Sequence, residues 1–205
     1  MSIVLYHHSH TRSANVVWML EELGLDYTLQ HVKLSAGEHK SPAMLALNPM
    51  GKLPILVDGD VVVTESAAIA LYLADRYSSG TLAPAFDDPA RGAYLRWSLF
   101  APSVIEPGSM AKAGGWESRE GAVGWGNHAA MLEAMAQAIG AGPYLLGERF
   151  SMADVVFGGT LRFMLAFNML EQRPIFVDYV ARLNARPANI AAKARNEAEL
   201  AAHPD

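Results

Sequence analysis

A glutamate–serine pair, Glu65-Ser66, stands directly before a run of apolar residues at helical spacing, 67–73. Ser66 is a favourable residue for opening a helix, because its hydroxyl can bond to the free backbone N–H groups of the first turn. A helix N-terminus attracts anions, since these N–H groups and the helix dipole place partial positive charge there. The pair therefore indicates a carboxylate-binding site; the alternative is an ordinary capped helix without a ligand.

A proline lies inside a β pattern shortly before this pair. Residues 53–57 and 61–64 read as two strands joined by a turn at 58–60, where Gly and Asp tolerate the positive φ that tight turns need. Pro54 has no N–H to donate, so it belongs at a strand start, an edge or a bulge. A cis bond at Pro54 would turn the neighbouring backbone N–H and C=O outwards, towards a ligand.

The order and spacing of these residues resemble the glutathione-binding half of the glutathione transferase family. The residues that carry the resemblance are Asn48, Pro49, Gly51, Lys52, Pro54, Glu65 and Ser66. Each dipeptide is a weak signal, whereas the ordered set is specific. The similarity is to cytosolic members of the family, and in particular to bacterial and theta-like members that use a serine.

A second motif extends the resemblance into the other half of the chain. Ser151 is followed three residues later by Asp154, which reads as a capping box with Asp in place of Glu. Together with the preceding stretch 144–147, it resembles the helix-start motif of the family's helical domain. Its expected role is in folding rather than catalysis.

The periodicity of the chain predicts two domains. Residues 1–77 show a β-α-β pattern and then a β-β-α pattern, which indicates a compact α/β unit. The resemblance makes this a thioredoxin-like domain over residues 1–78. A turn-rich linker follows, and residues 85–205 are expected to form an all-α domain with an irregular, glycine-rich connection at 114–126. Helices are predicted there at 89–101, 128–139, 152–168, 174–184 and 188–200.

Composition narrows the possible functions. The 205 residues are 51% apolar and 18% charged, as in a globular protein. The absence of cysteine excludes disulfides, cysteine–zinc sites and a cysteine nucleophile. The net charge is -5 and neither half is basic, so we expect no nucleic-acid surface. Without a signal-peptide pattern or an apolar run of bilayer length, the expected compartment is the cytoplasm and no membrane association is expected.

The resemblance implies a reaction of the glutathione thiol, whose pKa of about 8.5 leaves it mostly protonated at neutral pH. A hydroxyl donor and a helix dipole would lower that pKa. In the family the donor is a Tyr, Ser or Cys near the end of the first strand or the start of the first helix. Ser9 matches best and Thr11 is the next candidate, with Arg12 as a possible added charge. Ser13 and Tyr6 remain open alternatives.

The resemblance also assigns the rest of the tripeptide site. The Leu53 backbone, just before Pro54, should pair with the cysteinyl unit, and Glu65 with Ser66 should hold the γ-glutamyl end. Lys40 and Lys52 should reach the glycine carboxylate, with His39 a weaker choice. Candidates for an apolar pocket for the electrophile are Tyr94, Trp97, Phe100, Met110 and Trp116.

Three histidines, His7, His8 and His10, invite a metal interpretation, because alternate residues of a strand share a face. No acidic residue at a clear ligand spacing accompanies them and the family uses no metal, so we expect no metal here. A role in shaping the substrate entrance is the preferred reading.

The function predicted from the resemblance is conjugation of glutathione to small hydrophobic electrophiles by a homodimer. Two alternatives remain. One is a glutathione-dependent isomerase or dehalogenase on the same fold, and the other is a non-catalytic glutathione-binding protein, since fold alone does not fix function. A zeta-like isomerase would be expected to carry a Ser-Ser-Cys motif after the first strand, where this chain has Ser-His-Thr-Arg-Ser at 9–13.

Overall fold

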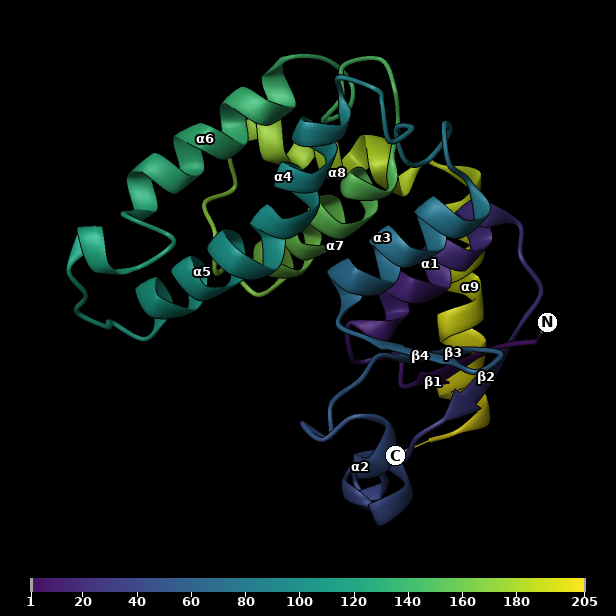
Figure 1. The fold of residues 1–205 in the computed structure, drawn as a ribbon. Helices are drawn as coiled ribbons and strands as arrows, with labels where there is room; N and C mark the ends of the chain where they lie inside the picture. The colour runs from purple at the N-terminus through teal and green to yellow at the C-terminus, as the bar shows by residue number, and fades with distance from the viewer. Residues whose placement is uncertain (1, 205) are drawn as a thin grey trace. The chain divides into compact units, whose positions relative to one another are not determined.

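Strand β1 (Ile3–His7) lies inside a four-stranded sheet of order β2-β1-β3-β4. β2 (Tyr27–His31) runs parallel to β1, and β3 (Ile55–Asp58) runs antiparallel to it. β4 (Val61–Thr64) pairs antiparallel with β3 through the predicted tight turn. The computed structural model describes residues 2–204, and the order of elements in the first 77 residues is the one predicted (Figure 1).

Helices cover both faces of this sheet. α1 (Ser13–Leu23) and α3 (Ser66–Tyr77) pack side by side on one face, and α2 (Pro42–Leu47) lies beyond the other face (Figure 1). The 3₁₀ turn η1 (Glu38–Lys40) precedes α2. The alternating residues of β1 explain this packing, because every second side chain faces the buried side and Leu5 is completely buried.

The last helix, α9 (Pro187–Ala202), belongs to this first unit and not to the helical one. The compact units are residues 1–77 with 186–205, and residues 78–185, so the chain returns to the sheet unit after the helices. α9 packs along α1, where Arg186 binds Glu22 through its Nε (2.7 Å to Oε1) and Nη2 (2.7 Å to Oε2). The predicted division into 1–78 and 85–205 differs from these units in this segment, because an alanine-rich amphipathic helix carries no signal for the unit it packs against.

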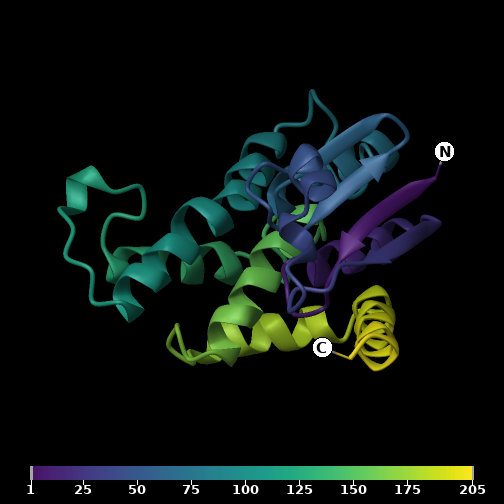
Figure 2. The same ribbon diagram turned by 90° about the horizontal axis from the view of Figure 1, so that it is seen from below.

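The second unit, residues 78–185, is helical as predicted. Its helix α4 continues through a π-helical turn, η2, into α5. The sequence did not indicate this continuous helix, because Pro102 and Pro107 lie within it. Each proline removes an N–H from this continuous helix, and between them the Glu106 N–H bonds to the Ala101 carbonyl five residues back, as in a π turn. Figure 2 shows the predicted irregular connection, which includes η3, looping beyond the ends of α5 and α6. The bounds are α4 Arg91–Phe100, η2 Ala101–Ile105, α5 Glu106–Ala113, η3 Glu120–Ala122, α6 His128–Gly140, α7 Met152–Ala166 and α8 Pro174–Asn184.

Helix α7 forms the centre of the second unit and is buried from Met152 to Leu161. Gly158 lets α8 approach closely, since a Cβ there would lie only 2.1 Å from the Leu183 Cδ1 atom. The predicted capping box is confirmed: the Ser151 N–H donates to Asp154 Oδ2 at 2.9 Å. Within residues 2–204, no helix combines the length and apolar character that crossing a bilayer would require.

Candidate functional site

The loop before β3 is organised by one buried side chain, Asn48. Its Nδ2 donates to the Lys52 carbonyl at 2.8 Å, and its Oδ1 accepts from the Met50 N–H at 3.1 Å. Gly51 lies between them with φ at 57°, and Lys40 crosses so closely that a Cβ at Gly51 would lie 2.7 Å from Lys40 Cδ. The Asn-Pro-x-Gly-Lys pattern therefore specifies a loop conformation, a role for Asn48 that the sequence did not indicate.

This loop ends in a cis peptide bond between Leu53 and Pro54, as considered from the sequence. Pro54 is buried and lies directly before the first residue of β3, so its missing N–H removes no bond from the sheet. Leu53 packs against the hydrophobic cluster of Val32, Met44 and Ile55, which fixes its side chain.

Glu65 and Ser66 join β4 to α3 in an unusual geometry. Glu65 has φ at 67°, a left-handed conformation that is uncommon for a residue other than glycine and that clusters at functional sites. Its carbonyl accepts the Ile69 N–H at 2.9 Å and so opens the helix. The Ser66 hydroxyl oxygen is buried and makes no hydrogen bond to any residue between 2 and 204. A buried polar atom without a partner is uncommon in a folded protein.

The two lysines differ in how they are held. Lys40 is exposed and its Nζ donates to the Met50 carbonyl at 2.8 Å, so it spans the Asn48–Lys52 loop. Lys52 is exposed at the end of the same loop. His39 lies beside Lys40 in η1 and is half-buried. The loop thus gathers positive charge next to the cis-proline.

The turn between β1 and α1 contains three hydroxyls, all engaged with the protein. Ser9 donates to the carbonyl of Asn196 on α9 at 2.9 Å, and Thr11 donates to the His8 carbonyl at 2.8 Å. Ser13 is fully buried, and its Oγ lies 2.9 Å from His7 Nδ1, so it holds the turn together and is out of reach of a ligand. Ser9 and Thr11 are half-buried.

His7 links two of these hydroxyls beneath the turn. Its Nε2 lies 3.0 Å from Ser9 Oγ, and because the Ser9 proton goes to Asn196, His7 Nε2 is the donor in this bond. His7 Nδ1 then accepts from Ser13. Burial, with a smaller contribution from neighbouring His8, lowers the pKa of His7 to about 4, so its ring is neutral at pH 7. Both ring nitrogens are occupied, which argues against His7 as a metal ligand.

The remaining candidates lie in packed surroundings. Tyr6 packs against the cluster of Val32, Met44 and Ile55, as an ordinary packed aromatic would. Tyr94 is fully buried and Trp97 is 8% exposed, so these two aromatics belong to the core of the second unit and their assignment to an electrophile pocket was wrong. Trp97 makes an edge-on contact with Phe157 at 6.0 Å between ring centroids.

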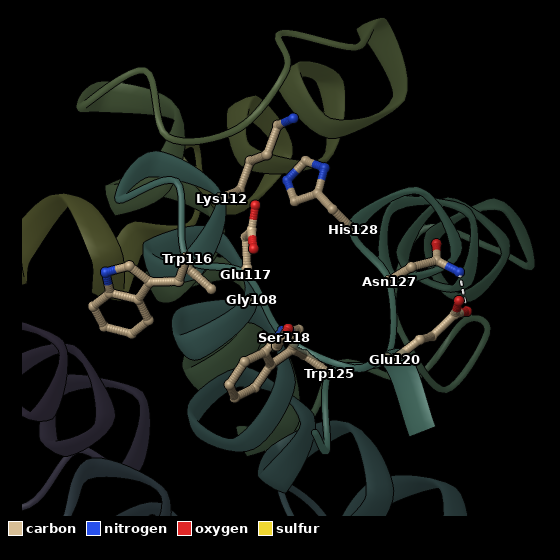
Figure 3. Close-up of a pocket in the computed structure, with 11 residues that line it drawn as sticks. Gly108, Lys112, Trp116, Glu117, Ser118, Glu120, Trp125, Asn127 and His128 are labelled. Atoms are coloured by element: carbon tan, nitrogen blue, oxygen red, sulfur yellow. Dashed lines mark hydrogen bonds between the residues drawn. The ribbon is translucent and has the colours of Figure 1, made fainter. Parts of the chain in front are cut away.

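Trp116 borders a hollow of about 520 Å³ within the second unit. Figure 3 shows Lys112, Glu117 and His128 near one another, with Trp125 across from Lys112 and His128, and Trp116 at the edge beside Glu117. The lining residues come from the C-terminal end of α5, the irregular connection and the start of α6. None of the predicted glutathione-binding residues lines this hollow.

The sheet order, the cis-proline loop and the helical second unit define a thioredoxin-like domain joined to an all-α domain. The family pattern "Glutathione S-transferase, N-terminal domain" matches residues 1–75, and "Glutathione S-transferase, C-terminal domain" matches residues 119–185. Glutathione S-transferase F14 of Arabidopsis thaliana is 31% identical over 192 residues, which cover 84% of this chain and 75% of the relative. The chain belongs to the glutathione S-transferase family.

Other relatives agree with this. Glutathione S-transferase 3 of Zea mays is 52% identical over 64 residues, 31% of this chain and 29% of that protein. Among solved structures, a glutathione transferase of Methylococcus capsulatus has a TM-score of 0.78 at 29% identity, covering 95% of this chain and 98% of that one. A Phanerochaete chrysosporium glutathione transferase in complex with oxidised glutathione has a TM-score of 0.79 at 26% identity, covering 95% and 96%.

Proposed function

We propose that this chain binds glutathione beside the cis-proline loop and joins its sulfur to a small hydrophobic electrophile. The observation that carries the proposal is the buried, unpartnered Ser66 hydroxyl at the N-terminus of α3. A carboxylate placed there would accept the Ser66 proton and the free N–H groups of the first turn. The left-handed Glu65 before it supports the same location.

In the proposed complex each part of the tripeptide has a partner. The γ-glutamyl end lies at Glu65 and Ser66, the cysteinyl backbone pairs with Leu53, and the glycine carboxylate lies near Lys40 and Lys52. The thiol gives up its proton to solvent, and the thiolate sulfur donates an electron pair to the electrophilic carbon. A carbon–sulfur bond forms, and the leaving group departs with the electrons of the bond that breaks.

Ser9 is the proposed donor to the thiolate, and Thr11 is the alternative. Each hydroxyl now donates to a backbone carbonyl, so it must exchange that neutral acceptor for the sulfur. The exchange is favourable because a hydrogen bond to an anion is stronger than one to a neutral carbonyl. A donor to the thiolate stabilises the charged form and therefore lowers the thiol pKa.

Binding and turnover are tested separately. Calorimetric titration with glutathione and S-methylglutathione should give binding, and a panel of aryl halides, epoxides and α,β-unsaturated carbonyls should show glutathione-dependent conjugation. Binding without conjugation, isomerisation or dehalogenation of any substrate would favour the non-catalytic alternative. Isomerisation or reductive dehalogenation without conjugation would favour the other enzymatic alternative, and no binding at about millimolar glutathione would overturn the proposal.

A pair of variants identifies the thiolate donor. Ser9→Ala should raise the apparent pKa of the pH–rate profile and lower kcat/KM by roughly ten- to a thousandfold, with little change in glutathione affinity. Thr11→Ala is the matched control, since it removes a hydroxyl of the same turn. If only Thr11→Ala shifts the profile, Thr11 is the donor. If neither does, backbone N–H groups, Arg12 or Tyr6 hold the thiolate and both assignments are wrong.

The proposed assembly is a homodimer, as the family resemblance implies. Light scattering coupled to size-exclusion chromatography should give twice the mass of one chain. The mass of a single chain at micromolar concentration would contradict it.

A further inference from the structure

A separate group of side chains gathers where the end of β2 meets the end of α9. His31 is the last residue of β2, and Glu199 and His203 lie at the C-terminal end of α9. One ligand atom from each of the three lies within 4.8 Å of the other two. His203 Nε2 and Glu199 Oε2 lie 3.7 Å apart. Both elements belong to the first unit, and none of these residues has a role in the proposed reaction.

We propose that His31, Glu199 and His203 bind a divalent transition-metal ion of the zinc type. Two imidazole nitrogens with one carboxylate oxygen are a usual ligand set for Zn²⁺, with water in the fourth position. A single carboxylate is a poor site for Mg²⁺ or Ca²⁺, which require mostly oxygen ligands. The chemistry of the donors therefore selects a borderline metal over a hard one.

The geometry needs a rotation of one exposed side chain, that of His203. Ligand atoms around a tetrahedral ion with bonds of about 2.1 Å lie about 3.4 Å apart, so the Glu199–His203 pair at 3.7 Å is already close. The rings of His31 and His203 now stack, with centroids 4.3 Å apart and planes 18° apart. Chelation requires the His203 ring to turn out of this stack, and its side chain, 48% exposed, has room to do so.

Two further histidines, His8 and His10, lie in the turn after β1 on the side of His31. The His8 ring lies 5.5 Å from His31, and the exposed His10 ring lies 5.4 Å from His8. His8 Nδ1 accepts the His10 backbone N–H, so His8 is engaged within the turn. The histidines noticed in the sequence thus lie beside a candidate metal site whose ligands come from elsewhere, with the acidic partner supplied by α9.

A metal here would tie the end of α9 to the edge strand. α9 is also the helix whose Asn196 carbonyl accepts the Ser9 proton, and whose Arg195 guanidinium lies 4.5 Å from the centre of the Tyr27 ring. The bound ion would therefore stabilise the docking of α9 onto the sheet unit. This consequence can be measured without any assay of activity.

The test uses the full chain without an affinity tag. Titration with ZnCl₂ followed by calorimetry should give one ion per chain, and saturating Zn²⁺ should raise Tm by about 5 °C, whereas Mg²⁺ should leave it unchanged. His203→Ala and Glu199→Gln should each weaken binding at least about tenfold and abolish the Tm shift. Co²⁺ should give visible absorption bands of a nitrogen- and oxygen-ligated ion.

The control is His128→Ala, which removes a histidine from the second unit and should bind Zn²⁺ as the unaltered chain does. His203→Ala changes an exposed side chain, so it should fold even if His31→Ala does not. The proposal is overturned if the unaltered chain binds no Zn²⁺ at about 0.1 mM, or if His203→Ala and Glu199→Gln bind it as tightly as the unaltered chain.

Discussion

Two serines, Ser66 and Ser151, stand at the start of helices, and their surroundings are opposite. Ser151 at the start of α7 donates its Oγ–H to Asp154 Oδ2 at 3.1 Å, and its backbone N–H bonds the same oxygen. Ser66 at the start of α3 has a buried hydroxyl oxygen with no hydrogen bond to any described residue. Serine is favoured at a helix start, so the difference between Ser66 and Ser151 lies in what surrounds each of them.

The difference separates a structural helix start from one that suits a ligand. Around Ser151 the polar groups satisfy one another, since Asp154 also accepts the Leu145 N–H at 2.9 Å and the Tyr179 hydroxyl at 2.8 Å. Burial raises the pKa of Asp154, and the hydrogen bonds it accepts oppose this effect. Around Ser66 the hydroxyl has no such partner among the described residues, which is why we propose it as a ligand contact. Losing Ser151 should therefore cost stability, and losing Ser66 should cost affinity for the ligand.

The largest effect is expected at the Ser151 helix start. Asp154→Ala should lower the free energy of unfolding by about 3–5 kcal/mol, because the Leu145 and Ser151 N–H groups and the Tyr179 hydroxyl would be left buried without an acceptor. Urea denaturation followed by circular dichroism measures the loss. Tyr179→Phe, which removes one donor and leaves the carboxylate in place, is the milder control. A loss below about 1 kcal/mol for Asp154→Ala would contradict the structural role that we assign to the hydrogen bonds at the start of α7.

The second expected effect is on ligand affinity at Ser66. Ser66→Ala should weaken glutathione binding by about 1–3 kcal/mol, because a charged carboxylate loses a hydroxyl donor. Its free energy of unfolding should stay within about 0.5 kcal/mol of the unaltered chain, since no hydrogen bond within the protein is lost. Calorimetric titration and urea denaturation of the same preparation give both numbers. Unchanged affinity together with lost stability would mean that Ser66 is a structural cap like Ser151.

The third prediction concerns His7 in the first unit, a buried side chain that, like Ser151, has its hydrogen bonds made within the protein. Its pKa is lowered from 6.5 to about 4 by burial, so between these values the unfolded chain binds a proton that the folded chain does not. Stability from this residue is fully present above pH 6.5 and falls as the pH drops towards 4. The expected loss between pH 7 and pH 5 is about 2 kcal/mol.

His7→Gln provides the control for this pH dependence, because an amide can replace both hydrogen bonds without titrating. Denaturation of both chains at pH 7 and pH 5 should show a smaller loss for the variant by about the same amount. Equal losses in the two chains would show that His7 does not titrate in this range on unfolding.

The same contrast explains what the sequence could predict. The Leu53–Ser66 region was predicted well because its conformation follows from local rules: Pro54 excludes a ladder bond, and Ser66 stands at the start of a helix. The hairpin was found where expected, and the cis bond is one that the sequence had left open. The box of Ser151 and Asp154 is likewise local, and it was predicted in detail.

The turn between β1 and α1 could not be predicted to the same depth. The acceptor of the Ser9 proton is a backbone carbonyl, at Asn196 of α9, which lies 187 residues away and has no side-chain signal. For the same reason the return of α9 to the sheet unit, and with it the group of His31, Glu199 and His203, was not visible in the sequence. Contacts between distant segments through backbone atoms depend on the fold as a whole.

The smallest effect is expected for the exposed charges near the cis-proline loop. Lys52 is exposed, so Lys52→Met should weaken glutathione binding by no more than about fivefold, and the difference should shrink at high salt because exposed charges are screened. Lys40→Met should have the larger effect, since Lys40 also donates to the Met50 carbonyl and its removal loosens the loop beside Gly51. Titrations of both variants at low and high salt compare them directly. The contrary result is that Lys52→Met weakens binding more than Ser66→Ala does, with no reduction at high salt. That result would place the main carboxylate contact at the loop and would contradict the ligand-binding role that we propose for Ser66.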